Sequence, residues 1–371
     1  MIVRVGVLTT SYPRTPGDYA GVFVADRVRE LLARGHEVEV LAAGAGAPLG
    51  TTRDGRLSLT RLPATFADGD DLFAGAGAPE ALERGGARAA WAALRFSAEL
   101  TAAAGARAPR WDRVESHWLA PCGLAALAAA PSLPHRAVAH SGDVSLLERA
   151  PFGRSFARLL ARSGAELVFV SEALRRRFAA LAGGVRGVVE PMSPQIVATA
   201  FNARDRRVSG NPIVVSVGRL VPIKGLDLLV RACAPRAGDV ARIHVVLVGD
   251  GSERERLREL AARLGVPLTL AGIVPRDEVP TWLRAADIYA QPSRTLANGR
   301  AEGMPLATLE ALAAGMPVVV SDSGGLGELP SRGARVRVVP AGDVDALARA
   351  LRAGLSERLA PDADGRIVTA V

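Results

Sequence analysis

The stretch 290–310 holds the residues whose types and spacing best suit chemistry on a phosphorylated ligand. Its central residues are Glu302, Gly303, Met304, Pro305, Leu306 and Ala307, and a second glutamate, Glu310, follows. Pro305 suits the first position of a helix, and Gly303 lets the backbone approach a ligand, so the N–H groups of Leu306 and Ala307 are predicted to face a phosphate. Glu302 and Glu310 can accept hydrogen bonds from sugar hydroxyls at either end of that ligand. An ordinary exposed place for Glu310 on its helix stays open.

Two cations follow the apolar run Ile213–Val217. Arg219 comes directly after this predicted strand, and Lys224 precedes Gly225 and the next predicted helix. An arginine fork and a compact ammonium at one strand end suit the charge of a diphosphate leaving group. Lys224 is the only lysine in the chain, so its retention favours a function over ordinary surface charge.

The first half of the chain offers a glycine loop and two histidines. Gly17 and Gly21 enclose Asp18 and Tyr19 between a predicted strand and a predicted helix, and His117 and His140 each follow a strand. An imidazole at such a strand end can bond a hydroxyl or steady a charge during a reaction. A structural role for either histidine inside the core is the alternative.

Other known sites are disfavoured. The pairs Asp68/Asp70 and Asp343/Asp345 match a D-x-D metal motif, but neither follows a strong strand, so no metal is predicted. No G-x-G-x-x-G with a following acidic residue and no G-x-S-x-G is present, which argues against a nicotinamide enzyme and a serine hydrolase.

The elements that must position these residues alternate between short β-branched runs and longer helical stretches. Predicted strands cover 2–8, 38–41, 113–116, 137–140, 167–170, 213–217, 244–248, 268–270, 288–290 and 318–321. Predicted helices cover 23–34, 87–100, 172–181, 226–233, 253–264, 278–285, 306–314 and 344–354, with Ser171 capping the third. The polar segment 202–212 separates two such series near residue 204. We therefore expect α/β architecture, with Rossmann-like domains at 1–203 and 204–371 facing each other across a cleft.

Composition agrees with a two-domain globular protein. The chain has 371 residues, of which 49% are hydrophobic and 23% charged, and this excludes disorder and fibrous repeats. The formal net charge of +8 is shared evenly between the two halves, so no nucleic-acid partner is expected. Two distant cysteines, no signal peptide and no long apolar run favour a cytoplasmic location.

One local excess of positive charge stands out. Between Arg149 and Arg186 eight arginines face two glutamates. Within this stretch Phe152, Phe156, Leu159 and Leu160 recur at helical spacing, with arginines elsewhere around the helix. Such a helix either packs on the core with a solvated back or lies on an anionic membrane surface, and both interpretations stay open.

The sequence resembles the retaining glycosyltransferases of family four, which have the GT-B fold. Glu302 and Glu310 match the E-x7-E signature of that family. Its other motifs occur in the same order, at 217–225, 247–251, 271–274, 286–289, 314–318 and 324–328. The resemblance implies a retaining, metal-independent hexosyltransferase that uses a UDP- or GDP-sugar and acts on a glycan or lipid-linked acceptor, in polysaccharide or glycolipid synthesis.

The resemblance also assigns roles to single residues. Glu302 and His140 would lie at the donor sugar, Glu310 at the ribose, and Arg219, Lys224 and Gly21 near the diphosphate. The base would lie against Gly272, Ile273, Val274 and Pro275. The sequence departs from the family after Met192 and lacks its long final helix. These departures leave open a degenerate sugar-nucleotide-binding module, and a sugar-nucleotide epimerase of similar fold is the other alternative.

Overall fold

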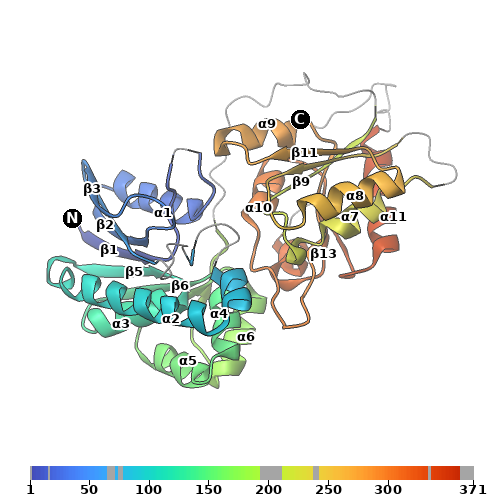
Figure 1. Cartoon of the computed structure of the whole chain (residues 1–371). Coiled ribbons are helices and arrows are strands. Elements are labelled where there is room, and N and C mark those ends of the chain that lie inside the picture. Colours follow the sequence, from blue (N-terminus) through green and yellow to red (C-terminus); the bar gives the residue numbers. More distant parts are fainter. Residues whose placement is uncertain are drawn as a thin grey trace. The chain divides into compact units, whose positions relative to one another are not determined.

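The chain folds into two compact units, Met1–Met192 and Ser193–Val371. The computed structural model in Figure 1 describes residues 2–15, 17–64, 72–73, 78–192, 211–236, 242–332 and 336–359. The domain boundary predicted near residue 204 lies outside these ranges.

Unit 1 is an α/β sandwich around an eight-stranded sheet of order β3-β4-β2-β1-β5-β6-β7-β8. Its strands are β1 (Arg4–Thr9), β2 (Glu37–Ala43), β3 (Gly50–Asp54), β4 (Leu57–Leu62), β5 (Arg113–His117), β6 (His135–Ala139), β7 (Glu166–Phe169) and β8 (Val188–Val189). Its helices are α1 (Val22–Ala33), α2 (Ala78–Gly105), η1 (Ala108–Arg110), η2 (Leu119–Gly123), α3 (Leu124–Ala129), α4 (Gly142–Arg149), α5 (Gly153–Arg162) and α6 (Glu172–Ala182). Every pair is parallel except β3 with β4.

Unit 2 has a six-stranded parallel sheet of order β11-β10-β9-β12-β13-β14. Its strands are β9 (Ile213–Val217), β10 (His244–Val248), β11 (Leu268–Gly272), β12 (Ile288–Gln291), β13 (Val318–Ser321) and β14 (Val336–Val339). Its helices are η3 (Pro222–Lys224), α7 (Leu226–Ala232), α8 (Arg254–Leu264), η4 (Arg276–Glu278), α9 (Val279–Arg284), α10 (Leu306–Ala313), η5 (Gly324–Arg332) and α11 (Val344–Leu359).

Most predicted elements are confirmed. β9, β10 and β13 have the predicted bounds, and the Ser171 hydroxyl accepts the Leu174 N–H at 3.3 Å at the start of α6. The hairpin β3–β4 was not predicted, because β3 is exposed along its whole length and lacks an apolar alternation.

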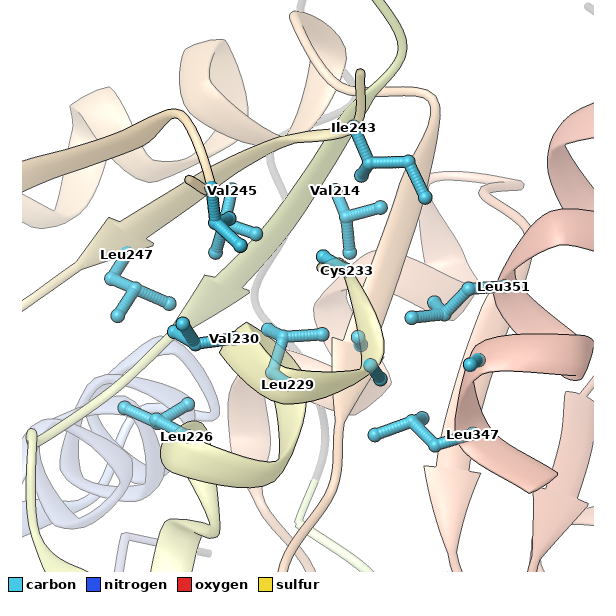
Figure 2. Packing of buried hydrophobic residues seen from close by; sticks show 14 of the residues in the cluster. Val214, Leu226, Leu229, Val230, Cys233, Ile243, Val245, Leu247, Leu347 and Leu351 are labelled. Atoms are coloured by element: carbon cyan, nitrogen blue, oxygen red, sulfur yellow. The ribbon is translucent and has the colours of Figure 1, made fainter. Parts of the chain in front are cut away.

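The core of unit 2 packs helices α7 and α11 against its sheet. Figure 2 shows Leu229 and Val230 of α7 among the strand residues Val214 and Val245, with Leu351 of α11 facing them. Each large side chain that is fully buried in this way contributes about 1.5–3 kcal/mol. This packing fixes the strand ends on which the loops of the candidate site are mounted.

Each sheet has one point where the strand order reverses. In unit 1 the chain proceeds outward from β1 in one direction and from β5 in the other, and in unit 2 from β9 and β12. Ligands of open α/β sheets bind beyond the carboxyl ends of the strands at such a point. The loops after β9 and β12, and those after β1 and β5, are therefore the places to look for a site.

Candidate functional site

Lys224 and Glu302 meet at the switch point of unit 2. Lys224 lies in η3 after β9, Glu302 lies between β12 and α10, and Lys224 Nζ is 3.0 Å from Glu302 Oε1. Both side chains are mostly buried, with 12% and 16% exposed. The strand order thus joins the predicted phosphate-binding cation to the predicted sugar-binding carboxylate.

Arg219 lies at the same strand end as Lys224. It follows Gly218, whose backbone has φ +144°, and a Cβ built on Gly218 would be 3.5 Å from Lys224 Nζ. Both predicted cations therefore lie in the short segment that follows β9.

Two glycines fix the backbone around this pair. A Cβ on Gly225, which has φ +63°, would lie 2.0 Å from the carbonyl oxygen of Pro292. A Cβ on Gly324, with φ +60°, would lie 1.9 Å from the carbonyl oxygen of Glu302. The Gly325 N–H also donates to that oxygen at 3.3 Å. Residue 302 is thus held by the loop after β13, which only glycine allows to come so close.

The N-terminus of α10 lies directly after Gly303 and Met304, and the helix begins at Leu306. Pro305 was predicted to be the first helical residue, but its ψ of 124° is extended, so it is the N-cap. Its carbonyl accepts the Thr308 N–H at 3.1 Å. The N–H groups of Leu306 and Ala307 belong to the first turn, whose donors have no intrahelical acceptor. Such donors suit an anion, and phosphate binding by these two residues stays a prediction.

Glu310 is buried and paired with Arg276, which excludes an ordinary exposed place for it. Arg276 Nη2 lies 3.1 Å from Glu310 Oε1. Arg276 begins η4 directly after the loop 272–275, in which the side chain of Ile273 is exposed. The sequence analysis did not identify Arg276, because a single arginine after a loop carries no signal until the fold places it beside Glu310.

A buried polar chain under α10 was also missed. The Tyr289 hydroxyl donates to Gln291 Oε1 at 2.9 Å, and Gln291 Nε2 donates to Ser293 Oγ at 2.9 Å. Thr308 of α10 donates to the Tyr289 oxygen at 3.4 Å. All four side chains are fully buried, and burial raises the pKa of Tyr289 above its usual range. The chain ties the start of α10 to β12.

In unit 1, Gly21 is required by the fold itself. It is the N-cap of α1 with φ +65°, and a Cβ there would lie 2.1 Å from the carbonyl oxygen of Ser11. The loop after β1 thus packs on the start of α1. The packing of this loop therefore requires a glycine at position 21, whether or not a phosphate also approaches it.

His140 directly follows β6 and lies beside His117, the last residue of β5. His117 Nδ1 is 3.1 Å from His140 Nε2, and the Phe23 ring lies 4.5 Å from that of His140. Burial lowers the pKa of His117 to about 3, and burial together with His117 lowers the pKa of His140 well below its usual range. Both imidazoles are neutral at pH 7, so His140 can act there through a hydrogen bond but not as a cation.

Asp143 holds the two histidine loops together. Its carboxylate accepts backbone N–H groups from Leu119 at 2.8 Å, from Ser141 and Val144 at 3.0 Å each, and from His140 at 3.2 Å. Burial raises its pKa although these hydrogen bonds partly offset the effect. It therefore fixes the backbone at His140.

The aspartates of the second D-x-D pair have structural partners within unit 2. Asp343 Oδ1 accepts the Ala346 N–H at 2.8 Å at the start of α11, and Asp345 pairs with Arg236 at 2.7 Å. Asp68 and Asp70 lie outside the described residues. Within the described ranges, no three His, Cys, Asp or Glu side chains are grouped as a metal site.

Family models match both parts of the chain. Residues 20–189 match the model "Glycosyltransferase Family 4", and residues 199–365 match "Glycosyl transferases group 1". Within the part of the chain that the structure describes, every helix is too short or too polar to cross a membrane.

Curated relatives and solved structures agree with these models. The GDP-mannose-dependent alpha-(1-6)-phosphatidylinositol monomannoside mannosyltransferase of Mycolicibacterium smegmatis is 35% identical over 213 residues, which are 54% of this chain and 56% of that protein. The amylovoran biosynthesis glycosyltransferase AmsK of Erwinia amylovora is 34% identical over 154 residues, 41% of this chain and 38% of its own. This chain therefore spans about half the length of such relatives, or less.

The structural likeness covers nearly the whole chain. The UDP-forming alpha,alpha-trehalose-phosphate synthase of Burkholderia vietnamiensis superposes with a TM-score of 0.72 and 18% identity, over 96% of this chain and 90% of that one. Anabaena HepE in complex with UDP gives a TM-score of 0.62 and 18% identity, over 95% and 90%. The predicted α/β architecture with two Rossmann-like domains is confirmed. The fold is that of these GT-B structures, and each of the two parts of the chain is similar to a glycosyltransferase model.

Proposed function

We propose that this protein transfers a hexose from a nucleoside diphosphate sugar to a hydroxyl of a glycan or lipid-linked acceptor, with retention at the anomeric carbon. The observation that carries the proposal is the contact of Lys224 with Glu302 beside the start of α10. It puts a cation and free helix N–H groups, which suit a diphosphate, next to a carboxylate, which suits sugar hydroxyls.

The chemistry follows from these groups. Arg219, Lys224 and the first turn of α10 bind the diphosphate and stabilise the negative charge that grows as the glycosidic bond breaks. The acceptor oxygen forms the new bond to the anomeric carbon on the face that the phosphate oxygen leaves, and its proton passes to that phosphate. Glu302 holds a hydroxyl of the donor sugar, while Glu310, oriented by Arg276, accepts from the ribose.

GDP-mannose is the first donor to test. The mycobacterial relatives that match at 35% identity are named as GDP-mannose-dependent, whereas HepE was solved with UDP. We therefore propose a GDP- or UDP-sugar as donor and polysaccharide or glycolipid synthesis as the setting.

We place the protein in the cytoplasm. Cys122 and Cys233 are buried and form no disulfide. Burial raises the pKa of Cys233 to about 12, so this thiol stays protonated.

The proposed reaction needs no metal, so EDTA should leave the rate of transfer unchanged.

The test is incubation of the protein with GDP-mannose and UDP-glucose, each with and without a candidate acceptor. Acceptor-dependent release of GDP or UDP, with NMR of the product showing the donor's anomeric configuration, is expected. Binding of nucleotide without turnover would favour the degenerate module instead. Conversion of the donor sugar without any acceptor would favour the epimerase, and an inverted product would overturn retention.

A further inference from the structure

Helix α5 packs on unit 1 through two small residues and one leucine. Gly153, Ala157 and Leu160 are its buried positions, and its neighbours are α4 and α6. A Cβ on Gly153 would lie 1.6 Å from the carbonyl oxygen of Leu147, so α5 approaches the end of α4 as closely as glycine permits. The face that holds α5 to the unit is therefore narrow.

The large apolar side chains of this segment point elsewhere. Phe152, Phe156 and Leu159 are 69%, 40% and 52% exposed. Phe156 and Leu159 lie three positions apart on one flank of α5, and Phe152 lies one turn before Phe156. Of the four apolar residues predicted at helical spacing, only Leu160 faces the core, where it is fully buried beside Gly153 and Ala157.

The arginines of α5 have no acidic partner among the residues that the structure describes. Arg154, Arg158 and Arg162 are exposed, and none of them forms an ion pair with any residue that the structure describes. The arginines of the next helix, α6, differ. Arg175 pairs with Glu172 at 2.6 Å, and Arg177 pairs with Glu148 at 2.5 Å. Within the basic stretch, α5 therefore carries a stripe of three exposed arginines that form no ion pair with the described residues.

We propose that α5 docks on an anionic lipid surface, with Phe152, Phe156 and Leu159 among the acyl chains and the three arginines at the headgroups. Apolar side chains beside uncompensated cations match the two layers of such a surface. Figure 1 shows α5 at the periphery of unit 1, remote from its sheet.

Other occupants fit the charges and the area less well. A second copy of the chain, docked face to face, would bring two sets of three arginines together without counter-charges. Three apolar side chains are also few beside the roughly 20–30 residues a side of a stable protein interface. A nucleic acid would meet the arginines but leave the phenylalanines in water.

The test is co-sedimentation of the full chain with vesicles of phosphatidylcholine alone or with added phosphatidylglycerol. Binding only to the anionic vesicles is expected at about 0.1 M NaCl. It should be largely lost at about 1 M, since the screening length falls from roughly 10 to 3 Å. No nucleotide is present, so the result does not depend on the proposed transfer reaction.

Two variants separate the two contributions. Replacing Arg154, Arg158 and Arg162 with Gln should weaken binding about fivefold per arginine and so about 100-fold in total. The double variant F156S/L159S should also weaken binding, but its residual binding should keep the salt dependence that the arginines provide.

Matched controls lie on other helices. Arg256 and Arg258 of α8 are exposed but paired with Glu253 and Glu255, so R256Q/R258Q should bind vesicles as the unaltered chain does. Circular dichroism checks that every variant is folded. The proposal is overturned if the unaltered chain shows no preference for anionic vesicles, or if the α5 and α8 variants lose binding equally. Self-association in sedimentation velocity that F156S/L159S abolishes, without vesicle binding, would assign the face to a second copy.

Discussion

The ion pair of Lys224 with Glu302 links two parts of one proposed reaction. A bound diphosphate would share the Lys224 ammonium with Glu302, and the freed carboxylate oxygen could then accept from a sugar hydroxyl. The compact ammonium suits this double role, because a guanidinium is longer, planar and directional.

Lys224 therefore gives the first prediction. Lys224→Ala should lower kcat by about 10²- to 10³-fold, the usual effect of removing one transition-state donor. Lys224→Arg should restore only part of the rate despite the retained charge. Steady-state release of GDP from GDP-mannose measures both. R236A, which breaks an exposed ion pair with Asp345, is the control and should keep the full rate. Equal rates for the alanine variant and the unaltered chain would contradict the proposed role.

Arg276 gives a prediction of a different kind, because it contacts Glu310, the carboxylate proposed to bind the ribose, rather than the reacting atoms. Arg276→Gln should raise the KM for the donor about tenfold and leave kcat nearly unchanged, since Glu310 loses its orientation but the diphosphate contacts stay. Isothermal titration with GDP gives an independent value. R256Q on α8 serves as the matched arginine control, and an equal fall in kcat and kcat/KM in R276Q would point to a role in the transition state instead.

At the scale of elements, the loops of unit 2 are positioned by backbone contacts that only glycine permits. Gly324, in the loop after β13, packs against the backbone of Glu302. Gly225, at the end of η3, packs against the backbone of Pro292 in the loop after β12. The buried chain from Tyr289 to Thr308 adds a polar tie between β12 and α10. These ties hold the groups proposed to bind the phosphate and the sugar at fixed separations.

Gly324→Ala should therefore damage the site beyond its cost in backbone strain. Its methyl group would lie 1.9 Å from the Glu302 carbonyl oxygen, so that loop must move. Gly315→Ala is the matched control, because Gly315 also has a positive φ, of +69°, but nothing within 4 Å of the added carbon. Backbone strain alone should cost each variant about 1 kcal/mol of stability. G324A should lose more stability than this and most of its donor binding, whereas G315A should not. Thermal unfolding and GDP titration compare them; equal losses would mean that the contact is unimportant.

At the scale of the whole molecule, buried neutral histidines couple stability to pH. The folded pKa of His117 is about 3, far below the value of about 6.5 in an unfolded chain. Between these values the unfolded state binds the proton and the folded state does not, so stability falls as the pH falls below about 6.5. The slope for one such histidine approaches 1.4 kcal/mol per pH unit.

Lowering the pH from about 7 to about 5 should therefore cost about 2 kcal/mol through His117 alone. Urea unfolding at a series of pH values measures this loss. His117→Asn should be less stable at pH 7 but should lose less on acidification than the unaltered chain. Parallel pH profiles for the two proteins would show that His117 does not titrate in this way.

Local patterns in the sequence were sufficient for the fold class, most elements and the candidate residues. The apolar periods of strands such as β9 and the glycine stop after α8 depend on neighbours within a few residues, so they can be seen without the fold. The order of the motifs likewise needs no contact between them. The same reasoning missed β3, whose exposed residues carry no period.

Only the tertiary structure decided which residues meet. The contact of Lys224 with Glu302 depends on β9 lying next to β12, and that of Arg276 with Glu310 on how η4 lies against α10. The exposed flank of α5 likewise depends on α4 accepting the small-residue face. Contacts between distant segments are set by strand order and by close packing of the core, which no local period in the sequence encodes.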